Sequence, residues 1–139
     1  MAEDIEVQPS QELVDVHKHY MDIINCMPNA VYWIDLNCKL QGYNDNFVKL
    51  LGIEEINDFS GTPYELLRKY AFWPDSRIDE LKLDDMGVIF SEKSKHNVEE
   101  SPVELGPDKD LYYLSTRVPL LDNNKKVNGL VVVLIDIED

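Results

Sequence analysis

Two pairs of adjacent carboxylates, Asp84-Asp85 and Glu99-Glu100, are the first residues of this sequence to examine for chemistry. A metal site or an acid–base pair needs oxygen atoms that converge on one point. Neighbouring residues in a helix or a strand face different directions, so neither pair is a good joint site. We therefore expect solvated carboxylates, no metal site and no catalytic dyad here.

Asp85 differs from the other three carboxylates because it falls at the one gap in an apolar helical stripe, in register with Leu81 and Val88. A carboxylate in that position must find hydrogen-bond donors, since an unpaired buried charge is very costly. We predict that Asp85 ties its helix to a strand, and contact with a ligand is the alternative.

The sequence gives little support to covalent or cofactor chemistry. It has no Ser or Cys motif with a His partner, and no phosphate-binding loop. The long predicted helix carries no His, and His96 begins a strand, which disfavours haem. Cys38 is predicted to lie in a hairpin turn and to point away from any pocket, which disfavours a flavin adduct. We expect no cofactor and no catalytic residue in this domain.

Aromatic residues are the remaining candidates for a binding site. They either line a small-molecule cavity between a sheet and its helices or fill the core. Together with Asp85, the candidate ligand-binding residues are Tyr32, Trp33, Tyr43, Phe47, Trp73 and Tyr113.

Length and charge limit the classes of protein that can hold these residues. The chain has 139 residues, enough for one domain, and a net charge of −14. That charge disfavours contact with nucleic acid and with anionic membranes. Only two cysteines are present, Cys26 and Cys38, and no apolar stretch is long enough to span a bilayer. We expect a cytoplasmic domain with reduced thiols.

The N-terminal part is predicted to be a disordered tail over 1–9 and an amphipathic helix over 10–27, capped by Ser10 and stopped by Pro28. The apolar face of this helix is wider than a lone surface helix needs. One of its rows is a candidate dimer interface: Leu13, Val16, Tyr20, Ile23 and Met27.

The middle of the chain is predicted to begin with a hairpin. Its strands span 30–35 and 40–43, and Asn37 is suited to a left-handed conformation in the turn. Asn44 caps a short helix over 45–51 that Gly52 closes. A second short helix spans 64–70, and a longer one, capped by Asp75 or Ser76, reaches residue 90.

Three strands are predicted to follow, over 97–105, 111–121 and 127–137. The last is apolar on both faces, so we place it at the centre of the sheet. Hairpin connections make the sheet antiparallel, and the class is α+β with helices on one face. The opposite face needs cover from the N-terminal helix, its own or that of a second copy.

Four segments in this order resemble a PAS domain, a sensor module of bacterial signalling proteins. They are Met27 to Asp35; Tyr43 to Phe47 with Leu50-Leu51-Gly52; Asp85 followed by Val98-Glu99-Glu100; and Leu120-Leu121-Asp122 with Gly129 and Ile135-Asp136-Ile137. Tyr32-Trp33 and Val118-Pro119-Leu120 look most like the PAS domains of sensor histidine kinases.

The resemblance implies a five-stranded sheet in the order 2-1-5-4-3 and a sensor domain over 28–139. It also implies a homodimer, an unidentified small-molecule ligand, and an effector domain in the same chain reached through Ile135, Asp136 and Ile137. Two alternatives remain open. One is a small stand-alone enzyme or carrier with a small-molecule pocket, and the other is a PAS fold with an empty core that serves only as an assembly surface.

Overall fold

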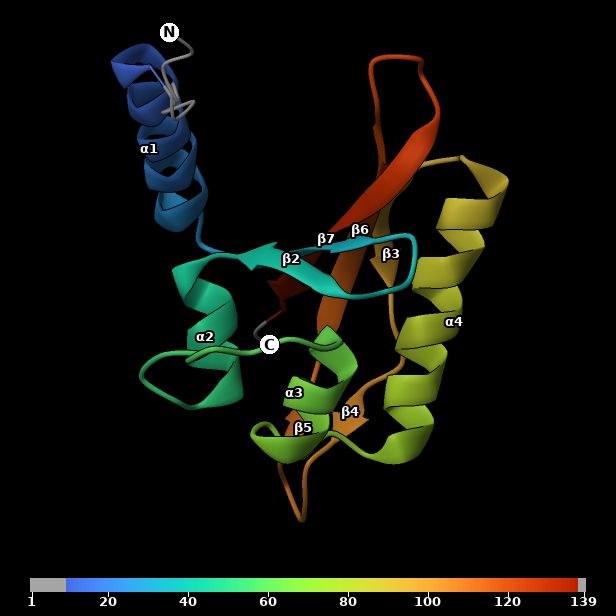
Figure 1. Ribbon diagram of the computed structural model, residues 1–139. Helices are drawn as coiled ribbons and strands as arrows, with labels where there is room; N and C mark the ends of the chain where they lie inside the picture. Colours follow the sequence, from blue (N-terminus) through green and yellow to red (C-terminus); the bar gives the residue numbers. More distant parts are fainter. Residues whose placement is uncertain (1–9, 138–139) are drawn as a thin grey trace, which may run out of the picture.

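The computed structural model describes residues 10–137, and the tail predicted over 1–9 lies outside them. Within this range the chain forms one five-stranded antiparallel sheet, a separate two-stranded sheet and four helices (Figure 1). The order of the large sheet is β2-β1-β7-β6-β3. Counted by strand within this sheet, that is the predicted order 2-1-5-4-3, so the predicted α+β architecture is confirmed.

The central strand is β7 (Val127–Asp136). It pairs on one side with β1 (Ala30–Asp35) and on the other with β6 (Tyr113–Leu121). The edge strands are β2 (Leu40–Tyr43) and β3 (Lys95–Glu99). Strand β7 is apolar on both faces because Leu130, Val132 and Leu134 point into the core, whereas the residues between them face the other side of the sheet.

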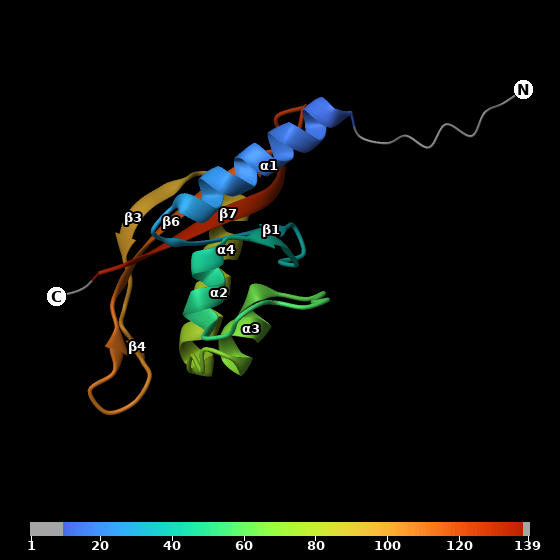
Figure 2. The same ribbon diagram turned by 90° about the vertical axis from the view of Figure 1, so that its left-hand side faces the viewer.

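Three helices cover the inner face of the sheet: α2 (Asp45–Leu51), α3 (Pro63–Lys69) and α4 (Asp75–Ser91). Helix α1 (Gln11–Cys26) lies on the opposite side of the sheet (Figure 2). Its predicted cap is confirmed, since the Ser10 hydroxyl accepts a hydrogen bond from the backbone N–H of Leu13. No residue of α1 is fully buried.

Helix α2 has the bounds that its sequence predicts, and α3 lies one residue before its predicted span of 64–70. The Asn44 side chain accepts a hydrogen bond from the N–H of Phe47 at the start of α2, and Gly52 ends that helix with φ 75°. At α3, Thr62 and Glu65 form a reciprocal capping box.

Two local predictions were wrong. Helix α4 begins at Asp75 with Pro74 at its N-cap, so neither Asp75 nor Ser76 caps it. In the first hairpin turn Cys38, rather than Asn37, takes the left-handed conformation, with φ 62°. The Cys38 side chain lies in the core and not in solvent.

The strand predicted over 97–105 is in fact two strands. Strand β3 ends at Glu99, and β4 (Val103–Glu104) pairs with β5 (Asp110–Leu111) in the separate small sheet. Pro102 has no N–H to donate to a ladder, which explains the break between β3 and β4. Val103 is fully buried and holds this small hairpin against the core.

Gly129 supplies a test of the central pairing. A Cβ atom at this position would lie 2.5 Å from the carbonyl oxygen of Ile34 on β1. We predict that Gly129→Ala lowers the free energy of unfolding by about 1–3 kcal/mol in urea denaturation, because backbone atoms must move.

The matched control is Gly87→Ala on α4, where a Cβ atom meets nothing within 4 Å. This substitution is expected to be neutral or to stabilise by roughly 0.5–1 kcal/mol, since Ala is the better helix former. Equal effects of the two substitutions would contradict the close approach of β7 to β1.

Candidate functional site

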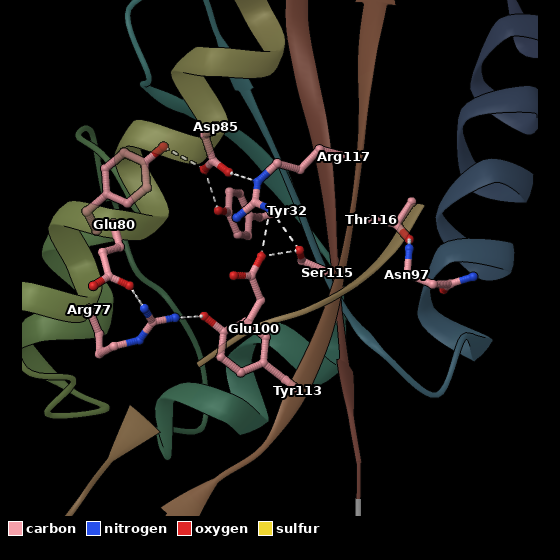
Figure 3. Close-up of polar contacts among 11 residues, drawn as sticks. Tyr32, Arg77, Glu80, Asp85, Asn97, Glu100, Tyr113, Ser115, Thr116 and Arg117 are labelled. Atoms are coloured by element: carbon pink, nitrogen blue, oxygen red, sulfur yellow. Dashed lines mark hydrogen bonds and ion pairs between the residues drawn. The ribbon is translucent and has the colours of Figure 1, made fainter. Parts of the chain in front are cut away.

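The inner face of the sheet carries a buried polar cluster around Asp85 (Figure 3). Asp85 projects from α4, and its side chain is fully buried. Its carboxylate accepts hydrogen bonds from the Tyr32 hydroxyl at 2.6 Å, the Tyr64 hydroxyl at 2.7 Å and Nε of Arg117 at 2.6 Å. One side chain thus connects α4 with β1, α3 and β6.

Arg117 extends the cluster along the sheet. Its Nη1 donates to Ser115 at 2.7 Å and to Glu100 at 3.1 Å, and the Ser115 hydroxyl donates to the same Glu100 oxygen at 2.5 Å. Tyr113, Ser115 and Arg117 all face inward because they alternate along β6. Glu100 reaches them from the segment between β3 and β4.

A second buried guanidinium lies beside this cluster. Arg77 of α4 donates to the Tyr113 hydroxyl at 2.7 Å and pairs with Glu80. Arg77 Nε and Arg117 Nη2 are buried nitrogen atoms that find no hydrogen-bond partner among residues 10–137. Buried donors in native proteins are rarely left without a partner.

Burial and charge shift the ionisation of these groups in opposite ways. Burial raises the pKa of the Asp85 carboxyl above its ordinary value, although Arg117 and the two phenols oppose the shift. Burial lowers the pKa of Arg117, but the Asp85 carboxylate together with Tyr32 and Glu100 outweighs burial, and the net shift of the pKa is upward. Burial also raises the pKa of Tyr32 and of Tyr64, so both phenols remain hydrogen-bond donors.

The predicted candidate site divides into three groups in the structure. Asp85 and Tyr32 belong to the polar cluster, the Phe47 ring packs on Tyr32, and the Tyr43 ring packs on Phe47. Trp73 and Tyr113 pack against each other, with ring centroids 5.6 Å apart, and line a pocket of about 240 Å³. Trp33 is not with the others, because it lies against Gly42 on the opposite face of the sheet.

The predicted orientation of Cys38, away from the interior, was also wrong. Its side chain is buried in the core and not directed away from it, and burial raises the pKa of its thiol. Cys26 is exposed near the end of α1, and the two cysteines form no disulfide.

Four members of the cluster were not predicted from the sequence: Tyr64, Arg77, Ser115 and Arg117. The expectation that Glu100 is a solvated carboxylate was wrong, because its side chain is only 10% exposed and bonds to Arg117 and Ser115. Side chains alternate between the two faces of the strand predicted over 111–121, and this alternation would have placed Arg117 on the inner face of the sheet. Asp85 was already expected on the apolar stripe of the helix that packs on that face. Nothing in the local sequence marks Glu100 as a partner, since it precedes a break between strands. In residues 10–137 no group of three His, Cys, Asp or Glu side chains is arranged to hold a metal ion.

The sheet order, the helices on its inner face and the N-terminal helix are together those of a PAS fold, and the chain has this fold. A comparison with family models and a search of curated protein sequences found no match. The evidence for the fold therefore comes from solved structures.

Three similar structures illustrate the likeness. The PAS domain of BvgS from Bordetella pertussis has a TM-score of 0.69 at 17% identity, covering 90% of this chain and 88% of that one. A sensory box sensor histidine kinase from Vibrio cholerae gives 0.61 at 14% identity, covering 94% and 98%. The VqmA dimer of Vibrio cholerae gives 0.67 at 20% identity, covering 88% of this chain and 52% of that one.

Asp85 supplies the test of the polar cluster. We predict that Asp85→Ala lowers the free energy of unfolding by about 3–5 kcal/mol, because it leaves the Arg117 charge buried without its partner. Urea denaturation followed by circular dichroism measures this loss.

The matched control is Asp84→Ala, which removes the exposed carboxylate next to it in sequence and is expected to change stability by at most about 0.5 kcal/mol. A loss at Asp85 no larger than that at Asp84 would show that the cluster is not a structural tie.

Proposed function

We propose that this chain is a PAS sensory and dimerisation domain that regulates a C-terminal effector, of the kind found in sensor histidine kinases. The observation that carries the proposal is the position of β7. This strand pairs with β1 and β6 and ends at Asp136, so a change in the sheet reaches the segment that leads out of the domain. Ile135, Asp136 and Ile137 are the proposed output residues.

The likeness to a sensory box sensor histidine kinase supports this reading of the fold. A ligand or a change of packing can shift such a domain only by favouring one of two arrangements over the other. The alternative of a small enzyme ranks lower, because Asp85, Arg117 and Glu100 bond to one another instead of facing the pocket. In the part of the chain that the structure describes, no helix is long and apolar enough to cross a membrane.

The dimerisation part of the proposal is supported by the exposed row of α1. Leu13 and Tyr20 are 61% and 62% exposed, and Val16, Ile23 and Met27 are exposed with them. Two other apolar residues of α1, Met21 and Ile24, are instead half-buried against the rest of the domain, whereas Val14 is 45% exposed. An apolar row that the domain itself leaves uncovered is suited to a second copy of the chain, packed in a two-fold arrangement.

Light scattering coupled to gel filtration tests this interface. The unmodified chain is expected at twice its 16.1 kDa mass, and the double variant Leu13→Asp with Ile23→Asp is expected at the mass of one chain. Burying two added carboxylates in an apolar contact is strongly unfavourable.

The control is Leu83→Asp with Phe90→Asp, which places the same charges on exposed apolar residues of α4 and should leave the dimer intact. A monomeric unmodified chain, or an unchanged mass for the α1 variant, would refute the proposed interface.

A further inference from the structure

A surface groove lies between strand β2, helix α2 and the segment over 53–60 that leads from α2 to α3 (Figure 1). It consists of adjoining cavities of about 430, 270 and 120 Å³, and Ile56 lines all three of them. None of the polar-cluster residues lines these cavities, and neither Trp73 nor Tyr113 does. The groove is therefore separate from the interior between the sheet and α4.

Apolar side chains form the floor of the groove. The residues that contribute them are Tyr43, Val48, Ile53, Ile56 and Phe59. Val48 is buried, whereas the other four are half-buried, so each of these four keeps part of its apolar surface open to solvent. Apolar surface gathered in a concave place is typical of a site that another molecule covers.

Carboxylates form the rim of the groove. Asp45, Glu54, Glu55 and Asp58 line the cavities, and all four are exposed. Within residues 10–137 none of them is part of an ion pair, and Lys49 is the one basic residue among those that line the cavities. We call this surface the acidic groove. Its four carboxylates against one ammonium group attract a cationic partner.

The wall over 53–60 is held at its two ends and unpaired between them. The N–H of Gly52 donates to the carbonyl oxygen of Lys49 at 3.0 Å, and the N–H of Leu40 donates to the carbonyl oxygen of Gly61 at 2.8 Å. Among residues 10–137, no backbone hydrogen bond forms to the segment over 53–60. Each of its residues carries a donor and an acceptor, so the wall can bond to the backbone of a partner.

The charge and geometry of the acidic groove exclude several occupants. In the described part of the chain no three acidic, His or Cys side chains are arranged to hold a metal ion. A second copy of the chain also has a net charge of −14, and nucleic acid presents phosphates, so both are repelled. A cationic segment of a protein meets the carboxylates, the apolar floor and the unpaired backbone together.

We propose that the acidic groove binds an extended segment of a partner protein in which lysine or arginine residues alternate with aliphatic residues. Successive side chains of an extended segment point to opposite sides, so the aliphatic ones can all enter the floor. The basic ones have long flexible stems that reach the exposed carboxylates of the rim. Backbone bonds and alternate side-chain pockets are a general mode of peptide recognition. This proposal depends on neither the effector nor the dimer proposed above.

Fluorescence anisotropy tests the groove with a labelled peptide of alternating lysine and leucine. We expect half-saturation at a concentration on the order of 10 µM in ~0.05 M salt. Binding should be roughly tenfold weaker in ~0.5 M salt, because salt screens the exposed carboxylates. A peptide of alternating lysine and serine keeps the charge without the apolar groups, and should bind at least about tenfold more weakly. Equal binding of the two peptides, or no binding of the first, would overturn the proposal.

Neutralising the rim gives a second test. The triple variant Glu54→Gln, Glu55→Gln and Asp58→Asn keeps the size of each side chain and removes its charge. Asn is suited to position 58, where φ is 42°. We expect this variant to bind the lysine–leucine peptide roughly tenfold or more weakly than the unmodified chain.

The matched control removes the same number of charges from the small hairpin of β4 and β5. It is the triple variant Glu104→Gln, Asp108→Asn and Asp110→Asn, whose three residues are also exposed. Both variants have the same net charge, so only position differs between them. The control should bind the peptide as the unmodified chain does. Equal losses in the two variants would show attraction to the overall charge alone, and would overturn the site.

Two further measurements locate the partner and identify its kind. In ¹H–¹⁵N NMR of the unmodified chain, the peptide is expected to shift the amides over 53–60 and to leave those over 104–110 unmoved, and the reverse result would overturn the site. In light scattering, the rim variant is expected to keep the mass of the unmodified chain. A changed mass would show that a second copy occupies the groove, and would overturn the choice of partner.

Discussion

A charge held away from water is the constraint on which this structure depends. The Asp85 carboxylate has to accept several hydrogen bonds where it lies, and its three donors come from β1, α3 and β6. Removing any one of these donors would leave a buried polar group without a partner, which is costly. The cluster therefore links α4 to these three elements, while the aromatic and aliphatic core supplies most of the apolar burial.

Local signals in the sequence were sufficient for most elements. Asn44 and Gly52 mark the two ends of α2 because side-chain capping and a left-handed backbone are properties of single residues. The apolar run in 127–137 likewise identified the central strand. Prediction failed between residues 97 and 111, where Pro102 separates β3 from β4 and the second piece pairs outside the main sheet. Which sheet a short strand joins is decided by contacts distant in sequence.

The candidate site was predicted in part for a similar reason. Asp85 stood out because a carboxylate interrupted an apolar helical stripe, which is visible in one segment. Its partner Arg117 lies 32 residues further along, and only the paired strands bring it close. The aromatic residues could be recognised as a set, but their division between core, pocket and outer face depends on strand register. Trp33 is an example: it directly follows Tyr32 in β1, so its side chain lies on the outer face of the sheet, whereas that of Tyr32 lies on the inner face.

Asn44 has a consequence beyond capping a short helix. Its oxygen accepts from the N–H groups of Val31 and Phe47, and its amide donates to the carbonyl oxygens of Ile24 and Asn29. One side chain therefore fastens the end of α1, the start of β1 and the first turn of α2 at a single joint. Because these four hydrogen bonds end on one side chain, the end of α1 cannot change its position relative to the start of β1 without breaking some of them.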